Sequence, residues 1–316
     1  MPLDHFVSQV HLKNFISPKL GNRLYAIRKS DVACFTPRTK DVCGIEDGST
    51  NAYLRQERAI EEFLKAIEPK YNTALRAARK GEIDQEAVLV FAGFAAFVTC
   101  CSPAAMRIGS GPLKSLVEVE AVLLDRQGLI ERAPPSLGEK TLTELLSEGA
   151  VRVAIEGKFP QALGITSILS RASIWGNSPW EILHNDNPNS PFFTSDFPVA
   201  IEQRPDGILN RIVPLAPDLA VRIIPDVRLS RSKPDLSFAK FRHRHCTIDR
   251  GMTADVNRLI VQCAEDLVFF RDEHEWTFQF VAKHRHYRVD SVTSKVPHGN
   301  GIMTLTSERI VERRTA

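Results

Sequence analysis

Hydrophobic residues between Arg55 and about Arg79 recur with the period of a helix. The recurring positions, three or four residues apart, are Ile60, Leu64, Ile67, Tyr71 and Leu75. This spacing places them on one face of a helix. Pro69 lies inside the stretch and lacks a backbone N–H, so we expect the helix to break near Glu68. Gly81 is expected to end the helix.

Other helices are expected from similar patterns and from residues that start or stop a helix. A short one near the N-terminus covers residues 8–15, with the Ser8 hydroxyl as its cap. The remaining helices of the first half cover residues 85–101, 113–126, 142–146 and 165–175.

After Pro179 the chain is dominated by short β-type runs separated by Pro, Asp, Asn and Gly. The expected strands are 23–27 near the N-terminus and 192–194, 212–213, 219–224, 278–282 and 302–305 in the second half. One helix, 253–270, interrupts the later set. Helices first and strands afterwards indicate an α+β fold, with a helical N-terminal half packed on a mixed, mainly antiparallel C-terminal half. We expect one domain over residues 1–316, helix-rich at 50–176 and strand-rich at 177–316.

Composition narrows the class of protein without naming an activity. Hydrophobic residues make up 43% and charged residues 25% of the chain, and the formal net charge is +3. These values are typical of a globular protein, and they do not require an acidic partner. The six cysteines lack zinc-site spacing, which favours reduced thiols and a cytoplasmic location. The sequence does not determine the oligomeric state.

The sequence also lacks the patterns of membrane spans and of several common enzymes. The most apolar stretch, Ala87 to Cys101, is shorter than the roughly 20 residues of a membrane span, so no membrane partner is expected. No signal peptide is visible at the N-terminus. There is no P-loop, no G-x-G-x-x-G, no H-E-x-x-H and no EF-hand loop, which argues against Walker-type ATP hydrolysis, nicotinamide redox chemistry and zincin proteolysis.

Four motifs, in order along nearly the whole chain, resemble a known family. The first is the opening HFVSQVHLKNF at residues 5–15, and the others are IEEFLKAIE at 60–68, FTSDFPV at 193–199 with Trp180 upstream, and PLAP at 214–217 followed by Asn257 and Ala264. They resemble the HYVPQFYLRNF, IE-x-x-L-x-x-IE, F-[IV]-TSDNPV and PLSP signatures of the domain-of-unknown-function family 4238.

This resemblance implies little about activity, and the chain departs from the family pattern in places. Where the family often has Q-x-x-R-x-P at the end of its central helix, this chain has Val98, Cys101 and Pro103. No role of that polar pair can therefore be transferred. Ser8 replaces a proline and Phe197 an asparagine, which are milder changes.

Three residues within these motifs are candidates for catalysis. His5 can act as an acid, a base or a metal ligand, or it can lock the N-terminal segment by a hydrogen bond. Asp196 can orient His5 or hold a cation, or it can cap amides in an Asx-type turn. Glu61 can complete a His5–Asp196–Glu61 cluster, or it can lie on a solvated helix edge. A divalent metal is therefore one candidate cofactor.

Four further residues are candidates for substrate binding. Gln9 and Asn257 are polar groups within the motifs, and Trp180 is included because the family usually has a Trp there. Ser195 is a weak nucleophile candidate because no G-x-S-x-G elbow surrounds it.

The C-terminal third carries a basic excess, with 16 Lys and Arg against 11 Asp and Glu from Arg228 onward. Two segments stand out, RHRH at 242–245 and KHRHYR at 283–288. If both are strands, the histidines point to one face and the basic residues to the other. The basic face would contain Arg242, Arg244, Lys283, Arg285 and Arg288. Paired His-x-His can bind zinc, basic strands can follow a phosphate backbone, and both can simply protect a sheet edge.

Two functions of different class follow. In the first, the protein is a hydrolase that acts on an anionic, phosphodiester-type substrate through His5, Asp196 and Glu61, with the basic face attracting that substrate. In the second, it is a non-catalytic module whose motifs fix the fold and whose basic face binds nucleic acid, another polyanion or a protein partner. The first predicts that the three candidates converge in a cleft, and the second that they are scattered or bonded to the backbone.

Overall fold

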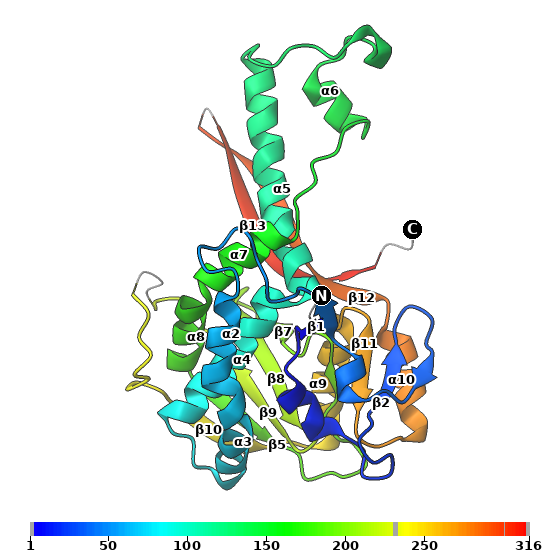
Figure 1. The fold of residues 1–316 in the computed structure, drawn as a ribbon, viewed down its shortest axis with the longest axis vertical. Coiled ribbons are helices and arrows are strands. Elements are labelled where there is room, and N and C mark those ends of the chain that lie inside the picture. Colours follow the sequence, from blue (N-terminus) through cyan, green and yellow to red (C-terminus); the bar gives the residue numbers. More distant parts are fainter. Residues whose placement is uncertain (1–2, 230–232, 300, 314–316) are drawn as a thin grey trace.

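The computed structural model describes residues 3–229, 233–299 and 301–313 of the chain (Figure 1). Helices dominate between residues 59 and 177, and strands of mixed and antiparallel sheets dominate after residue 180. The α+β class expected from the sequence is confirmed.

The N-terminal segment combines short strands with one turn of helix. Its elements are β1 (Leu3–His5), α1 (Gln9–Leu12) with the 3-10 turn η1 (Lys13–Phe15), β2 (Tyr25–Arg28), β3 (Cys34–Phe35), the 3-10 turn η2 (Thr39–Asp41) and β4 (Gly44–Glu46). Ser8 precedes α1 but does not cap it with its side chain. Its hydroxyl donates instead to Glu68 Oε1 at 2.5 Å, so that expectation is wrong. The Ser8–Glu68 bond joins the first two family motifs.

The break expected at Pro69 is confirmed. Helix α2 (Ala59–Ile67) ends before the 3-10 turn η3 (Glu68–Lys70), and α3 (Tyr71–Lys80) follows it. Gly81 caps α3 in the left-handed region with φ +84°, where a residue without Cβ fits best.

The central helix is α4 (Gln85–Cys101), which is buried along nearly its whole length. It packs against α3, α7 (Lys158–Thr166) and α8 (Ile168–Asn177). Helix α5 begins at Pro103 and runs to Arg126, so it starts earlier than the expected residue 113. The Ser102 hydroxyl accepts from the backbone N–H of Ala105 at 3.1 Å, which supplies the helix start that the hydrophobic pattern did not reveal. A 3-10 turn η4 (Pro135–Leu137) and α6 (Leu142–Ser147) follow.

The strands form two larger sheets and a long hairpin. The five-stranded sheet has the order β10-β5-β9-β8-β7, and only its β10–β5 pair is parallel. Its strands are β5 (Trp180–His184), β7 (Ala200–Gln203), β8 (Leu209–Ala216), β9 (Leu219–Ile223) and β10 (His243–Thr247). Helix α8 lies against this sheet, where Arg211 of β8 stands 5.8 Å from the centre of the Trp175 ring.

The four-stranded sheet joins the N-terminal segment to strands from the second half of the chain. Its order is β3-β2-β11-β6, and its later strands are β6 (Thr194–Ser195) and β11 (Leu267–Phe270). Strand β2 pairs with β11 in an antiparallel register that matches Ala26 with Phe269. The N-terminal segment is therefore built into the strand-rich half.

Two sequence expectations in the last third are wrong. The expected helix 253–270 is α9 (Arg250–Cys263) followed by strand β11. The helix stops because the backbone N–H groups of residues 265–267 donate to the Asp196 carboxylate and not to helical carbonyls. The expected strand 278–282 lies within α10 (Glu275–His284).

An arm extends from the body, as Figure 1 shows. It consists of α5, the segment with α6, and the hairpin of β12 (Tyr287–His298) and β13 (Gly301–Glu312), which packs on α5. A Cβ atom on Gly111 would lie 1.8 Å from Ser291 Oγ and 3.1 Å from Ser291 Cβ, so a larger residue in this close approach of helix and hairpin would displace the serine hydroxyl. Arg107 fixes the base of the arm through Glu265 at 2.6 Å and Asp290 at 3.1 Å.

Within the described ranges, no single helix has both the length and the apolar character needed to cross a membrane. One bent pair, 59–80 with 85–101 at 116°, meets those two criteria together.

Candidate functional site

His5 lies at the end of β1, beside a cavity of about 10 Å³. Its Nε2 is 3.3 Å from the Lys40 carbonyl oxygen, and Gln9 Nε2 stands 3.3 and 3.4 Å from the two ring nitrogens. These are long hydrogen bonds, and a cavity of this size holds at most one water molecule. Among the predicted site residues, His5 and Gln9 are brought together.

Glu61 belongs to a different group of charges on α2. Its carboxylate bonds to the Arg58 guanidinium, which also reaches Asp4 Oδ1 at 3.2 Å. Arg58 therefore lowers the pKa of the Glu61 carboxyl below its usual value. The Arg58 guanidinium thus pairs with the charged Glu61 carboxylate and connects α2 to strand β1.

Asp196 is buried, and the backbone holds its carboxylate. Oδ1 accepts from the N–H of Glu265 at 2.8 Å, and Oδ2 accepts from those of Asp266 and Leu267 at 2.8 and 2.9 Å. Burial raises the pKa of Asp196 to about 6, against these amides and the nearby Lys29 charge, which lower it. Of the two alternatives set by the sequence, these contacts correspond to amide capping.

Lys29 is a second buried charge beside the same turn. Its side chain is 1% exposed, and Nζ donates to the carbonyl oxygens of Ala264 at 2.6 Å and Tyr287 at 2.8 Å. Burial lowers the pKa of Lys29 to about 8. Lys29 and Asp196 thus both bond to the backbone of the turn between α9 and β11, Lys29 to a carbonyl oxygen and Asp196 to N–H groups.

The remaining predicted binding residues also bond to the backbone. Asn257 accepts from the Phe193 N–H at 2.9 Å and donates to the Pro191 carbonyl at 2.8 Å. Ser195 Oγ accepts from the Phe197 N–H at 3.2 Å, and Trp180 Nε1 donates to the Trp175 carbonyl at 2.7 Å. His5, Asp196 and Glu61 thus have separate partners, and among the described side chains no three His, Cys, Asp or Glu are placed to hold a metal ion.

Sequence reasoning missed His11, the second histidine of the opening motif. It is fully buried, with Nδ1 2.8 Å from the Tyr71 hydroxyl and Nε2 2.8 Å from Thr194 Oγ1. Its ring stacks on Phe94 with centroids 4.6 Å apart. Burial lowers its pKa to about 3, so the imidazole is neutral near pH 7. Its position between Val10 and Leu12 in an apolar stretch is the sequence feature that could have predicted a buried histidine.

The predicted basic face is not one surface. Arg242 and Arg244 lie at the sheet edge formed by β10, whereas 283–288 forms the end of α10 and the start of β12. These regions are far apart in Figure 1. The contiguous basic face expected from two strands is therefore wrong, because Lys283 and His284 are helical.

Most of the predicted basic side chains already have partners. Arg244 bonds to Glu181, which Arg222 also binds at 2.6 Å. Arg285 donates to the carbonyl oxygens of residues 29 and 30 at 3.3 and 3.2 Å, and Arg288 pairs with Asp290 at 2.9 Å. These three arginine side chains therefore already form ion pairs or hydrogen bonds within the protein.

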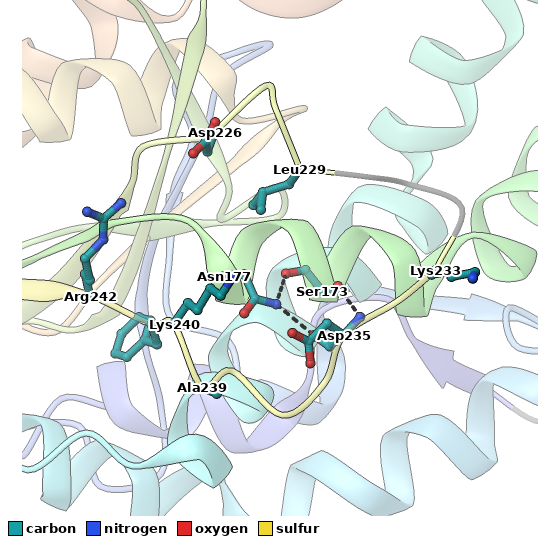
Figure 2. Close-up of a pocket in the computed structure, with 10 residues that line it drawn as sticks. Ser173, Asn177, Asp226, Leu229, Lys233, Asp235, Ala239, Lys240 and Arg242 are labelled. Atoms are coloured by element: carbon teal, nitrogen blue, oxygen red, sulfur yellow. Dashed lines mark hydrogen bonds between the residues drawn. The ribbon is translucent and has the colours of Figure 1, made fainter.

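A groove of about 610 Å³ lies beside α8 (Figure 2). Its lining comprises Ser173 and Asn177 of α8, with Asp226, Leu229, Lys233, Asp235, Ala239, Lys240, Phe241 and Arg242. Asn177 donates to the Asp235 carbonyl at 2.7 Å, and the Asp235 N–H donates to Ser173 Oγ at 2.8 Å. These two bonds attach the outer wall of the groove to the helix.

Three exposed cations line this groove: Lys233, Lys240 and Arg242. None of them forms an ion pair in the parts of the chain that the structure describes. Asp226 is held by Arg228 at 2.8 Å, and Asp235 Oδ1 accepts from the N–H and hydroxyl of Ser237. The groove therefore carries three cations and two carboxylates, of which Asp226 is paired with Arg228, whereas Asp235 is hydrogen-bonded to the neutral Ser237 and lies within the electrostatic reach of Lys240.

A row of aromatic rings borders the groove along β10. Phe241 stands edge-on to Trp180 at 5.0 Å and stacks on His243 at 5.2 Å and 18°. His243 is edge-on to His245 at 5.2 Å, and His245 lies 5.1 Å from His184 of β5. Cations and partly or fully exposed aromatic residues thus occur side by side at this edge of the sheet.

The comparisons with known proteins agree with the motifs. The family model described as "Protein of unknown function (DUF4238)" matches residues 4–274. No curated protein and no solved structure matches the chain. The match ends before α10 and the β12–β13 hairpin.

Proposed function

The chain belongs to the DUF4238 family of proteins of unknown function, and from the groove beside α8 we propose that it is a non-catalytic module that binds single-stranded nucleic acid. The ligand's phosphates would contact Lys233, Lys240 and Arg242. The cytoplasmic location is part of this proposal, supported by six cysteines without a disulfide.

The charge of the groove carries the proposal. A phosphate backbone binds through Lys and Arg side chains that release its counterions, and cations already paired inside a protein contribute less. Lys233, Lys240 and Arg242 are exposed and line one concavity, whereas Arg244, Arg285 and Arg288 are engaged elsewhere. The groove is thus where the described C-terminal cations are most available to an anionic ligand.

The rings beside the groove favour a nucleic acid over an acidic peptide. Single-stranded binding sites combine a basic groove with aromatic side chains on which bases stack. Phe241 lines the groove and is partly exposed, and the exposed His243 ring stacks on it. An acidic peptide would use the cations but would have no need of these ring faces.

The hydrolase hypothesis stays a prediction. It requires His5, Asp196 and Glu61 to act on one substrate, but each has its own set of partners, and Asp196 accepts three backbone hydrogen bonds. The geometry therefore offers more support to the binding module.

A fluorescence anisotropy titration with a labelled oligothymidylate tests the proposal. We expect binding to weaken as salt is raised, with Lys240→Glu reducing affinity at low salt by about tenfold. In Arg242→Ala the slope of log affinity against log salt should fall by about 0.7, the value of one lost phosphate contact on a single strand.

The matched control is Lys283→Glu, the same charge reversal on the distant part of the predicted basic face. It should change affinity by less than about twofold. Equal losses in Lys240→Glu and Lys283→Glu would reject the groove as the site. Binding of polyglutamate without binding of the oligonucleotide would reject the nucleic-acid class.

A further inference from the structure

The β12–β13 hairpin is a separate two-stranded sheet, and it therefore has two edges. Helix α5 lies mainly along β12, which leaves β13 as the outer strand. Figure 1 shows the distal half of the hairpin projecting from the body beside α5. The outer edge of β13 in this half is thus accessible to another strand.

The contacts of β12 show which backbone groups of the hairpin point outward. Residues of an antiparallel pair alternate between bonding to the partner strand and pointing away from it. The carbonyl oxygens of Tyr287 and Val289 accept hydrogen bonds from Lys29 at 2.8 Å and from Arg107 at 2.9 Å. Both carbonyls point away from β13, because both donors lie outside the hairpin. Odd-numbered residues of β12 therefore direct their backbone groups outward.

The register of the hairpin extends this alternation to β13. It pairs Thr293 with Thr306 and continues without a bulge along both strands. Thr304 and Thr306 lie opposite odd-numbered residues, so their N–H and C=O groups point away from β12. Pro297, which has no N–H to donate, is also odd-numbered, as this alternation requires. Within the described residues, the outward groups of Thr304 and Thr306 pair with no other strand.

The exposed segment of β13 lacks the features that usually protect a sheet edge. Residues 303–307 have the sequence MTLTS, all five are exposed, and none is charged or a proline. Soluble proteins protect open edges with charges, prolines or bulges, because unpaired N–H and C=O groups bind further strands. The next residue, Glu308, is charged, but its carboxylate already binds Arg211 of β8 at 2.6 Å. The edge at 303–307 is therefore open to strand pairing.

The same segment has an apolar face. Met303 and Leu305 are 40% and 52% exposed, and Val296, the cross-strand neighbour of Met303, is 39% exposed. These side chains lie on one face, because cross-strand pairs and residues two apart share a face. Beyond Val289, no hairpin residue whose burial the structure describes is buried. Two strands alone are marginally stable in water, so additional strands would stabilise this half of the hairpin.

We propose that β13 pairs antiparallel with β13 of a second copy of the chain, about a two-fold axis at Leu305. In this register Thr304 lies opposite Thr306 of the second copy, and their outward N–H and C=O groups bond to each other. The two Leu305 side chains lie side by side and extend the apolar face. The result is a four-stranded antiparallel sheet shared by two chains.

Symmetry and charge favour a second copy over an unrelated strand. A strand paired antiparallel with its own copy is complementary to it, because the two-fold axis repeats every contact. In the register about Leu305, Glu308 and Arg309 fall opposite residues 302 and 301 of the second copy, which are uncharged. No like charges therefore meet across the interface. This dimer is independent of the ligand proposed for the groove.

Sedimentation velocity of the full chain without nucleic acid, over an about hundredfold range of concentration, tests the proposal. A single strand edge is a small interface, so we expect a monomer–dimer equilibrium with a dissociation constant on the order of 10 μM. Thr306→Pro removes an outward N–H and leaves the bonds to β12, so it should weaken dimerisation at least about tenfold. Leu305→Lys should do the same, because it places two like charges at the axis.

Two matched variants serve as controls. Thr306→Ala loses the same hydroxyl, which lies 3.0 Å from that of Thr293, but it keeps the N–H and should dimerise as the wild type does. Leu129→Lys adds the same charge at an exposed leucine outside the hairpin and should also dimerise normally. Thermal unfolding identifies any variant that fails to fold, and Leu305→Lys changes an exposed side chain if Thr306→Pro does fail.

A disulfide in Leu305→Cys tests the register. Residue 305 faces its own copy in a non-hydrogen-bonded pair, where Cα atoms lie about 4.5 Å apart, a separation that a disulfide can span. Under oxidising conditions this variant should form a covalent dimer, whereas Leu129→Cys should form no more than the wild type with its exposed Cys34. A wild type that stays monomeric, unchanged dimerisation in folded Thr306→Pro or Leu305→Lys, or equal cross-linking in the two cysteine variants overturns the proposal.

Discussion

The ring of His11 lies 2.8 Å from the hydroxyl of Thr194, although 183 residues separate them in the chain. With Tyr71 on the other ring nitrogen, this bond joins the opening motif, helix α3 and strand β6 in the core. The side chain of His5, only six positions earlier, has hydrogen bonds no shorter than 3.3 Å. The two histidines of one motif therefore have different roles in the fold.

Replacing His11 with alanine should destabilise the protein by about 3 kcal/mol or more, because it leaves a cavity and two buried hydroxyl groups without their partner. His5→Ala should cost less than about 1 kcal/mol, since its bonds are long and partly exposed. Urea denaturation of both variants measures the difference. Similar losses of stability in the two variants would show that the hydrogen bonds of His11 to Tyr71 and Thr194 contribute little to stability.

The free energy of unfolding should also decrease as the pH is lowered, and His11 should be one cause of this decrease. The pKa of His11 is about 3 in the folded protein against 6.5 for a solvated histidine, so the unfolded chain binds a proton that the folded one does not. The stability is complete above pH 6.5 and is lost progressively between 6.5 and 3. At pH 5 the loss from this group should be about 2 kcal/mol. In His11→Ala the slope of stability against pH between 7.5 and 5 should be visibly smaller than in the wild type.

Asp196→Asn should destabilise the fold by about 2–4 kcal/mol. The asparagine retains one acceptor oxygen but directs an NH₂ group toward backbone N–H groups that had a carboxylate partner. Asp255→Asn, on the exposed side of α9, is the control and should cost less than about 0.5 kcal/mol. Thermal unfolding compares them, and an Asp196→Asn protein as stable as the control would contradict the structural role of this carboxylate.

Gly176→Ala tests the support of the groove. A Cβ there would lie 2.3 Å from the Phe238 ring and 3.0 Å from Val88 Cγ1, so buried Phe238 would have to move. We expect a loss of about 1–3 kcal/mol and weaker oligonucleotide binding. At Gly157 the nearest atom would be the Met106 sulfur at 3.5 Å, so Gly157→Ala should affect binding little. If Gly176→Ala bound the oligonucleotide normally, the wall near Phe238 would not shape the site.

Local patterns predicted the helical half better than the strand-rich half. The periodic apolar positions and Pro69 gave both α2 and α3 and the break between them, because backbone and hydrophobic constraints act there within a few residues. In contrast, α9 ends because of Asp196, which is 69 residues from Glu265 in the sequence. Helix α10 was missed although Trp276, Phe280 and His284 recur at steps of four and contact one another.

The candidate site residues could likewise be predicted only in part from local sequence patterns. Motif matching found Asp196 and Asn257, but residue type alone does not distinguish a carboxylate that faces a substrate from one that accepts three amides. The alternation expected for His243 and His245 is confirmed because that segment is a strand. The same reasoning fails for His284 and His286, which lie at a helix end. The groove combines residues from α8 with a later loop, and no local spacing in the sequence indicates that meeting.

The pairing of β2 with β11 bears on how the chain reaches its fold during synthesis. Residues 25–28 leave the ribosome long before residues 267–270, so strand β2 has no partner on that edge until β11 has been synthesised. His11 likewise lacks its Thr194 hydrogen-bond partner until that residue has been synthesised, and its apolar neighbours are exposed until then. We therefore expect late, concerted docking of the first strands, and a need for chaperone protection of the growing polypeptide.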